Sequence, residues 1–442
     1  MTMNVIRKQQ NNEKATRFSL TALLCIAVVI LNVSNVLVQT INGMASEKSI
    51  IFLCMNTMFL VLFSCIPVNM IVNYSWAYYG VYVILLICGL FIGETSTNYI
   101  SFGGSFSLDI NSLLAMLFLP VTYLIVKYKN YSWRYLTIIG TAILIPTLLT
   151  MMFQNINGAL VFMFVALLLL IKAIFEKRMK ISVFKLLLAF CSFIFFVTIL
   201  FVILNPVSLQ RLAEFVNSDR TEVVEDAVYT EKFSVAGSII KNSPMIANSA
   251  NSNYDLQIFD GESGWEFVSL LACHGWVAGL FLLGGQIILI ITAYRMSHQI
   301  KNSYAKYLSF AIASFFGVSL VIAIAQTYNV IPFTGKQMPL MGTASANIID
   351  HGLVGMLICF YVKKDKITTK IELDVDYDST TCKNRLRATI CTEVRFHFNG
   401  RVPHFIKSAK ICGILFHAHK RVTTNMEVYQ NGKLQGNPAA AA

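Results

Sequence analysis

Four ionisable side chains lie within or at the edge of long apolar stretches of this sequence, where a charge is costly. Two of them are neighbours, Asp350 and His351, and the other two, Glu266 and His274, lie about two helical turns apart. Ionisable groups in such segments must be paired or in contact with water, and they often mark substrate pathways. For Asp350 and His351 we keep two interpretations, a structural hydrogen-bonded role and a role in a substrate cavity. Glu266 fits a membrane-headgroup position, and His274 fits a packed neutral histidine better than a catalytic base.

An irregular stretch of sequence surrounds the first of these pairs. From Val330 to Gly355 it reads VIPFTGKQMPLMGTASANIIDHGLVG, rich in small residues, proline and glycine, with Lys336 as its only lysine. Irregular backbone at membrane depth is tolerated where it is buried in protein or lines a wet cavity. Lys336 either marks the membrane boundary or meets an anionic ligand as a point charge.

The composition predicts the elements that position these residues. Of the 442 residues, 56% are hydrophobic and 13% are charged, whereas soluble domains carry about 25% charged residues. A membrane-crossing helix needs roughly 20 apolar residues. Ten stretches approach this length, at about residues 19–39, 50–72, 75–93, 110–126, 135–153, 158–175, 184–205, 265–294, 305–326 and 340–362. The predicted fold class is therefore an all-α polytopic membrane protein with ten transmembrane helices.

The distribution of basic residues predicts the orientation of these helices. Lys and Arg gather at the N-terminus, in alternate short loops and directly after the last apolar stretch. Because cytoplasmic loops carry the basic excess, both termini are predicted to be cytoplasmic. Anchoring against anionic lipid accounts for most of the net charge of +12, so no nucleic-acid partner is predicted. The first apolar stretch is full length and is predicted to be a retained helix, not a cleaved signal.

Three regions follow from this topology. Residues 1–18 form a cytoplasmic N-terminus, residues 19–362 the membrane domain, and residues 363–442 a cytoplasmic tail with a few strands and a disordered end. Within the membrane domain, residues 206–264 form a large, acidic external loop between the seventh and eighth helices. Loops this long are usually functional or disordered. Helix-like apolar spacing occurs in two segments of this loop, 209–215 and 231–240. It predicts short helices on the membrane surface.

The sequence contains no phosphate loop, dinucleotide fingerprint or zinc-protease helix. In the tail, His417 and His419 would face one side of a strand and could join Cys412 at a metal ion. An ordinary basic strand is the favoured interpretation, because no second ligand pair has the spacing of a zinc site.

Four stretches, taken in order along the chain, resemble segments of one protein family. They are ISFGGSFSLDINSLLAMLFLPV before the fourth helix, QNINGALVFMFVALLLL at the sixth, LQRLAEFVNSD at the start of the large loop, and FTGKQMPLMGTASAN before the tenth. Together with the predicted topology, they resemble the SEDS proteins (shape, elongation, division and sporulation), the FtsW, RodA and SpoVE type of bacterial cell-wall protein. The resemblance covers about residues 15–362 and none of the tail.

The resemblance implies a peptidoglycan glycosyltransferase of the bacterial cytoplasmic membrane, active in cell division, elongation or shape. Such proteins polymerise lipid II, a disaccharide-pentapeptide on undecaprenyl pyrophosphate, with a class B penicillin-binding protein as partner. A carboxylate would deprotonate the acceptor sugar hydroxyl, and cations or a divalent metal ion (Mg²⁺ or Mn²⁺) would stabilise the leaving pyrophosphate. The substrate-binding residues expected on this basis are Arg211, Lys336, Asp350 and His351.

The sequence departs from the family pattern at its acidic positions. In an ungapped register, the family's catalytic Asp aligns with Gly264, while Asp260 and Glu262 align with the Glu and His of the same motif. A small shift would let Asp260 or Glu262 serve as the catalytic base. Other acidic positions of the family fall at Ile110, Ile156, Ala272 and Cys273. The chain is therefore expected to be a divergent member of the family.

Three functions are compatible with these observations. The first is a divergent glycosyltransferase that uses Asp260 or Glu262 as its base, and the second is a non-catalytic scaffold that binds and activates a class B penicillin-binding protein. The third is an O-antigen polymerase or ligase, which ranks lower because such proteins depend on external-loop arginines and this loop has only Arg211 and Arg220. A lipid-linked-oligosaccharide flippase would need more charged residues along a central cavity.

Overall fold

The computed structural model describes most of the chain between residues 2 and 364. The described residues are 2–41, 46–92, 94–96, 99–102, 106–109, 117–127, 133–152, 156–179, 181–204, 228–247, 264–331, 334–342 and 344–364. The chain divides into one unit that ends at Thr369 and a second that begins at Lys370. The second unit, for which the sequence predicts strands and an alternative metal site, lies outside the described residues.

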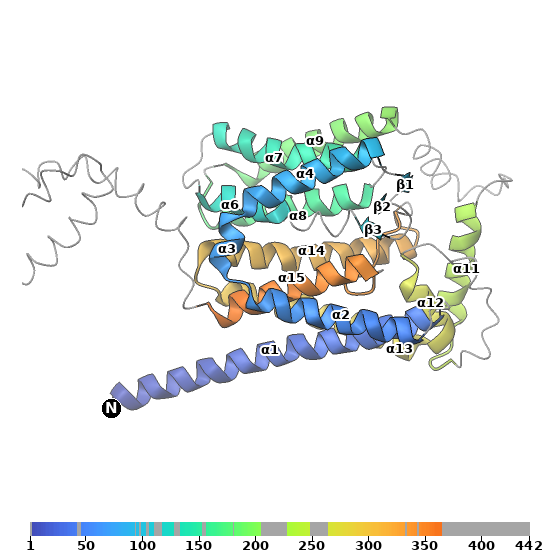
Figure 1. Cartoon of the computed structure of the whole chain (residues 1–442), viewed down its shortest axis with the longest axis horizontal. Coiled ribbons are helices and arrows are strands. Elements are labelled where there is room, and N and C mark those ends of the chain that lie inside the picture. Colours follow the sequence, from blue (N-terminus) through green and yellow to red (C-terminus); the bar gives the residue numbers. More distant parts are fainter. Residues whose placement is uncertain are drawn as a thin grey trace, which may run out of the picture. The chain divides into compact units, whose positions relative to one another are not determined.

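Long apolar helices dominate the first unit (Figure 1). They are α1 (Thr2–Ile41), α2 (Ser46–Cys65), α4 (Ser75–Ile92), α6 (Phe118–Lys127), α7 (Trp133–Met152), α8 (Ile156–Phe175), α9 (Val183–Leu204), α13 (Trp276–Gln299), α14 (Ser303–Thr327) and α15 (Ala344–Val362). In space, α2 lies along α15 and α1 lies along α13, while α14 packs against both α13 and α8. Helices far apart in sequence thus become neighbours in the bundle.

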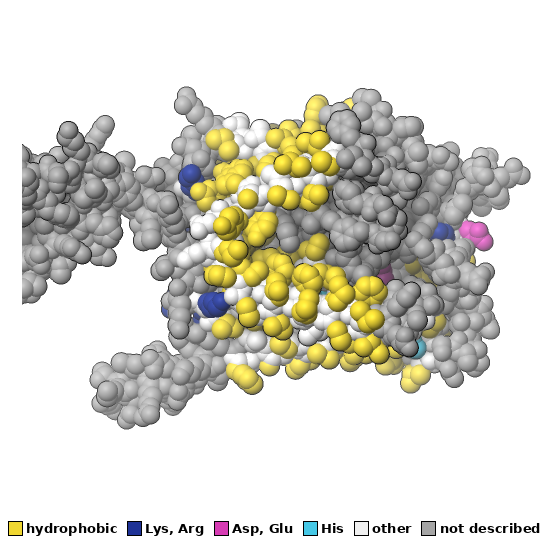
Figure 2. Space-filling view, in the orientation of Figure 1, with side chains coloured by type: hydrophobic (Ala, Val, Ile, Leu, Met, Phe, Trp, Pro, Cys, Tyr) yellow, Lys and Arg dark blue, Asp and Glu magenta, His cyan; other side chains and the backbone are white. Residues whose placement is uncertain are grey.

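Four of these helices have spans long and apolar enough to cross a membrane. The spans are Phe18–Ile41 in α1, Gly158–Phe175 in α8, and the whole of α13 and α14. The described residues also contain six shorter apolar helices, within α2, α4, α6, α7, α9 and α15. Figure 2 shows hydrophobic side chains across most of the described face, where lipid tails would contact a membrane protein. The chain is a multi-pass membrane protein, and the count of ten crossings stays a prediction.

Two predicted helices are broken in the structure. The stretch 50–72 divides at Pro67 into α2 and the short helix α3 (Val68–Asn73), because proline has no N–H for a helical hydrogen bond. The stretch 265–294 divides at Gly275 into α12 (Glu266–His274) and α13. Gly275 has φ 79°, and an added Cβ would lie 2.5 Å from the carbonyl oxygen of Pro244, so only glycine fits this junction.

The helices agree with the all-α prediction, and the structure also contains a small sheet that the sequence did not predict. Strands β1 (Glu94–Ser96), β2 (Tyr99–Phe102) and β3 (Phe106–Asp109) form an antiparallel meander in the order β1-β2-β3. Strands of three or four residues are too short to show a clear period-two pattern in the sequence. The helix predicted at 110–126 is described from Phe118, and its first part lies outside the described residues.

A helix is present at one of the two segments for which short surface helices are predicted, and its location on the membrane surface stays a prediction. Helix α11 (Val228–Asn242) contains the segment 231–240, and the segment 209–215 lies outside the described residues. α11 packs on the start of α12, where the rings of Phe233 and Trp265 meet edge to face with their centroids 5.5 Å apart. Helix α11 is therefore attached to the helical bundle at α12.

The turn after α8 carries an ion pair to the start of α14. Nζ of Lys306 lies 2.8 Å from Oε1 of Glu176, and Nη2 of Arg178 donates a hydrogen bond to Oγ of Ser303 at 2.7 Å. Oδ1 of Asn302 accepts the N–H of Ala305 at 3.0 Å and caps α14. These contacts fix the relative position of α8 and α14 at one end of the bundle.

Candidate functional site

The start of α12 and the irregular stretch between α14 and α15 meet at one buried glutamine. Gln326, near the end of α14, is completely buried. Its Nε2 donates to the carbonyl oxygens of Lys336 at 2.7 Å and Gly264 at 3.4 Å. Its Oε1 accepts the N–H of Lys336 at 3.1 Å and the hydroxyl of Thr334 at 2.7 Å. One amide therefore joins two segments that lie some seventy residues apart in the sequence.

A second buried amide holds the same stretch from the other side. Nε2 of Gln286, in α13, donates to the carbonyl oxygen of Pro339 at 2.6 Å. Irregular backbone has polar groups that no helix satisfies, and leaving them unpaired in an apolar bundle is costly. The two glutamines supply those partners. Sequence reasoning did not single them out, although an amide within an apolar helix is a signal that could have found them.

Gly264 leaves no room for a side chain. Its φ is 103°, and an added Cβ would lie 2.6 Å from Nε2 of Gln326 and 3.2 Å from the backbone of Gly335. Side chains rarely adopt this backbone conformation, so any substitution would be strained. Residue 264, at which the ungapped sequence register predicts the family's catalytic Asp, therefore cannot carry an aspartate in this backbone arrangement.

The carboxyl group of Glu266 lies directly beside this glycine. Oε1 of Glu266 accepts the N–H of Gly264 at 2.9 Å, and the side chain as a whole is 8% exposed. Oε2 is buried and accepts no hydrogen bond from the described residues. Burial raises the pKa of Glu266 to about 7, although backbone N–H groups and the charge of Lys336 act in the opposite direction. Glu266 precedes α13, whose whole length is a candidate membrane span. With a pKa of about 7, its carboxyl group can gain or lose a proton near neutral pH.

Lys336 supplies the positive charge of this site. It is 8% exposed, and its Nζ lies 5.2 Å from the ring centroid of Phe315 in α14. Gln326 holds its backbone on both sides, through the N–H and the carbonyl oxygen. The lone lysine of the irregular stretch therefore lies inside the protein, and its charge acts on the carboxyl group of Glu266 in α12. We call Gly264, Glu266, Gln326, Thr334 and Lys336 the junction site.

The structure gives Asp350 and His351 structural partners. Oδ2 of Asp350 accepts the N–H of Leu340 at 3.0 Å. Nδ1 of His351 lies 2.8 Å from the carbonyl oxygen of Asn347, and Nε2 lies 3.1 Å from Oδ1 of Asn32 in α1. These contacts agree with a structural, hydrogen-bonded role for both residues. A substrate role for either residue stays a prediction. His274, at the end of α12, is half-buried and outside the junction site.

The remaining predicted site residues lie outside the described residues. They are Arg211, Asp260 and Glu262, so their expected roles stay predictions. Within the described part of the chain, no three His, Cys, Asp or Glu side chains come together in a group that could hold a metal ion. Among the described residues, the donor set of the junction site is one carboxylate and one ammonium group, which does not fit a divalent cation.

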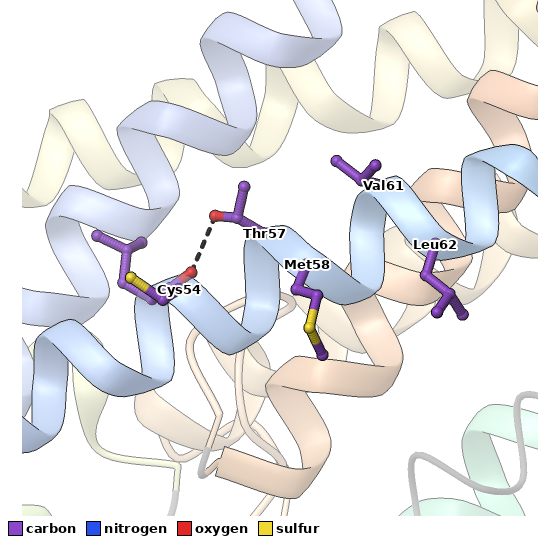
Figure 3. Close-up of a pocket in the computed structure, with 6 residues that line it drawn as sticks. Cys54, Thr57, Met58, Val61 and Leu62 are labelled. Carbon is purple, nitrogen blue, oxygen red and sulfur yellow. Dashed lines mark hydrogen bonds between the residues drawn. The ribbon is translucent and has the colours of Figure 1, made fainter.

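A groove on α2 offers a contrast with the junction site. It has a volume of about 690 Å³ and is lined by Leu53, Cys54, Thr57, Met58, Val61 and Leu62 (Figure 3). Its only polar contact among those side chains is within the helix, where Oγ1 of Thr57 donates to the carbonyl oxygen of Leu53 at 2.9 Å. This lining contains the Cys54 thiol and the Thr57 hydroxyl but no carboxyl, amino or imidazole group.

Comparison with known proteins adds to this geometry. No protein-family profile matches the sequence. The chain is 24% identical to "Probable peptidoglycan glycosyltransferase FtsW" of Coxiella burnetii (strain RSA 493 / Nine Mile phase I) over 164 residues, 36% of this chain and 44% of that protein. The match therefore spans less than half the length of this relative.

Solved structures share the fold over a longer part of the chain. A chain of the structure described as "Structural coordination of polymerization and crosslinking by a peptidoglycan synthase complex" superposes with a TM-score of 0.61 at 17% identity, covering 79% of this chain and 98% of that one. The rod shape determining protein RodA of Thermus thermophilus superposes with a TM-score of 0.55, with 14% identity and the same coverage. The chain therefore shares its fold with these two solved structures, and the FtsW match agrees with the resemblance to the SEDS family that the ordered sequence motifs carry.

Proposed function

We propose that this protein polymerises lipid II at the outer face of the bacterial cytoplasmic membrane. The observation that carries the proposal is the junction site, where the buried residues Glu266 and Lys336 belong to one hydrogen-bonded network around Gln326 and the charge of Lys336 acts on the carboxyl group. Glycosyl transfer from a lipid pyrophosphate needs a proton acceptor for the incoming hydroxyl and a cation for the leaving group. The names of the FtsW relative and of the peptidoglycan synthase complex support the same reaction class.

The reaction balances with the groups that the chain offers. The acceptor sugar hydroxyl gives its proton to a carboxylate, and its oxygen forms a bond to the anomeric carbon of the donor sugar. The bond from that carbon to the pyrophosphate oxygen breaks, and the electron pair leaves with the lipid pyrophosphate. Lys336 is placed to stabilise the charge that develops there, and Arg211 of the large loop is a second candidate for this role. We propose a class B penicillin-binding protein as the partner, and cytoplasmic locations for both termini.

A non-catalytic scaffold is the second candidate function. The observation that favours it is Gly264, because a side chain at the position of the family's Asp is sterically excluded. In this case the protein would bind and activate a class B penicillin-binding protein without transferring sugars itself. The junction site would then serve only to hold α12, α14 and the intervening stretch together.

A polymerisation assay separates the two functions. The purified full-length chain is incubated with fluorescent lipid II in detergent micelles, alone and with a class B penicillin-binding protein from the same genome, and the products are separated by gel electrophoresis. A ladder of glycan products is expected with the wild-type chain. Lys336→Met should reduce the polymerisation rate strongly, whereas Lys241→Met, at an exposed position on α11, should not. No ladder under any condition, while the partner still co-purifies, would leave only the scaffold function.

A further inference from the structure

One oxygen of the Glu266 carboxyl group accepts a hydrogen bond, and the other accepts none from the described residues. Oε1 is held by the N–H of Gly264 at 2.9 Å, and Oε2 is buried without a hydrogen-bond partner among the described residues. Leaving a carboxylate oxygen in this condition costs free energy, so such groups call for an explanation in function or in an unseen partner. A fixed orientation with one free oxygen is the arrangement that a proton acceptor needs.

From this geometry we infer that Glu266, and not Asp260 or Glu262, accepts the proton of the acceptor sugar hydroxyl. This inference rests on the proposed function and names one residue within it. The bond formed is that between the acceptor oxygen and the anomeric carbon, the bond broken is that to the lipid pyrophosphate, and the proton moves to Oε2 of Glu266. No other reactant is needed.

The position of Glu266 supports this assignment sterically. Gly264 cannot carry a side chain of its own, because Gln326 and Gly335 occupy the space that a Cβ would enter. The side chain of Glu266 instead reaches back from the first turn of α12 and places its carboxyl group against the backbone of Gly264. A carboxyl group is thus present beside residue 264, although it comes from a residue two positions later.

The electrostatic surroundings also suit a proton acceptor. The charge that acts on Glu266 is that of Lys336, and burial places the pKa of the carboxyl group at about 7. A base with a pKa near the working pH combines a useful ionised fraction with a strong tendency to take up a proton. Other titratable side chains on the described helices packed against α12, and on α12 itself, are Cys25, Glu231, Lys232, Lys241, Cys273, His274, Tyr294, Arg295 and His298.

The test compares acidic variants in the same lipid II polymerisation assay, with the full-length chain and its penicillin-binding partner. Glu266→Gln keeps an oxygen that can accept the N–H of Gly264 but removes the proton acceptor, so we expect the rate to fall roughly 100-fold or more. Asp260→Asn, Glu262→Gln and the control Glu231→Gln, at an exposed position on α11, should stay within a few-fold of wild type. Glu266→Asp should keep a measurable rate.

Two further readouts separate a chemical role from a structural one. The thermal midpoint and the co-purification of the partner show whether each variant is folded, and the pH profile of the wild-type rate reports the base directly. We expect the rate to rise with pH around 7, and Glu266→Asp to shift that rise. A Glu266→Gln protein that polymerises within three-fold of wild type, or a wild-type rate that is flat between pH 5.5 and 8, would overturn the inference while the proposed function stands. A wild-type protein without activity would overturn the proposed function itself.

Discussion

The carboxylate of Asp350 accepts the backbone N–H of Leu340, with 3.0 Å between Oδ2 and the nitrogen. Leu340 is completely buried and has φ 61°, a left-handed conformation that costs a branched side chain free energy. The hydrogen bond from α15 offsets part of this cost. It fixes the end of the same irregular stretch that carries Lys336 into the junction site.

Substitutions of Asp350 should separate its structural role from a substrate role. Asp350→Asn retains an oxygen that can accept the N–H of Leu340, whereas Asp350→Ala leaves that buried donor unpaired at a cost of about 1–3 kcal/mol. We therefore expect Asp350→Ala to lower the thermal midpoint in detergent micelles, and Asp350→Asn to stay close to wild type in both stability and polymerisation. A stable Asp350→Asn protein that has lost polymerisation would instead show that the negative charge contacts substrate.

Replacing Gly264 with alanine should disrupt the junction site. The new Cβ would enter the space of the Gln326 amide and strain a residue with φ 103°, which costs about 1–3 kcal/mol. We expect Gly264→Ala to lower the thermal midpoint and to reduce polymerisation.

Gly284→Ala is the matched control for this substitution. Gly284 lies within α13, and an added Cβ there would meet nothing within 4 Å. Alanine favours a helix interior over glycine by about 0.5–1 kcal/mol, so this variant should be as stable as wild type or more stable. Equal thermal midpoints for Gly264→Ala and wild type would mean that the junction adapts freely, contrary to the structure.

Physical reasons decide which parts of this protein the sequence predicts. The stretches 135–153 and 158–175 correspond to α7 and α8 within a few residues, because a membrane crossing imposes a minimum apolar length on the sequence. The division at Gly275 does not follow from hydropathy, since the residues on both sides are apolar apart from His274. Its cause is the contact with Pro244, a residue from another segment.

The junction site shows the same limit for function. Glu266 and Lys336 were both noticeable in the sequence, one at the edge of an apolar stretch and one in an irregular break. Their two segments are joined by Gln326, which hydrogen-bonds to both across the fold. Burial and neighbouring charge change the chemistry of a carboxyl group, and neither can be read from residue types along the chain. The structure shows that Glu266 is buried in the protein, and the headgroup depth expected for it stays a prediction.

The ion pair between Glu176 and Lys306 should contribute modestly to stability. Burial by itself raises the pKa of Glu176, but the hydrogen bond and the charge from Lys306 outweigh it, so the pKa lies below its usual value. This stabilisation is present above the unfolded-state pKa near 4.5 and is lost as the pH falls through the folded-state value. Both side chains are 28% exposed, so screening by solvent reduces the coupling free energy to about 0.5–1 kcal/mol.

A double-mutant cycle with Glu176→Gln and Lys306→Met measures this coupling. Thermal unfolding at neutral pH should show that the double variant is more stable than the sum of the single effects implies. High salt should reduce the difference. Lys177→Met, which removes an exposed neighbouring charge, serves as the control, and a zero coupling free energy at low salt would contradict the ion pair.

Titration of Glu266 should make the stability of the protein decrease as the pH rises, which is the opposite of the effect expected for Glu176. Its folded-state pKa of about 7 lies above the unfolded value of 4.5, so the folded protein binds more protons between these values. The stabilisation from the protonated carboxyl group is fully present below pH 4.5 and is lost as the pH rises through 7, at up to about 1.4 kcal/mol per pH unit. In wild type, the thermal midpoint should therefore decrease from pH 5 to pH 7.5, after subtraction of the trend seen in Glu266→Gln. Identical pH trends for wild type and Glu266→Gln would show that the carboxyl group of Glu266 ionises as it does in water, and that the junction site does not bury it in solution.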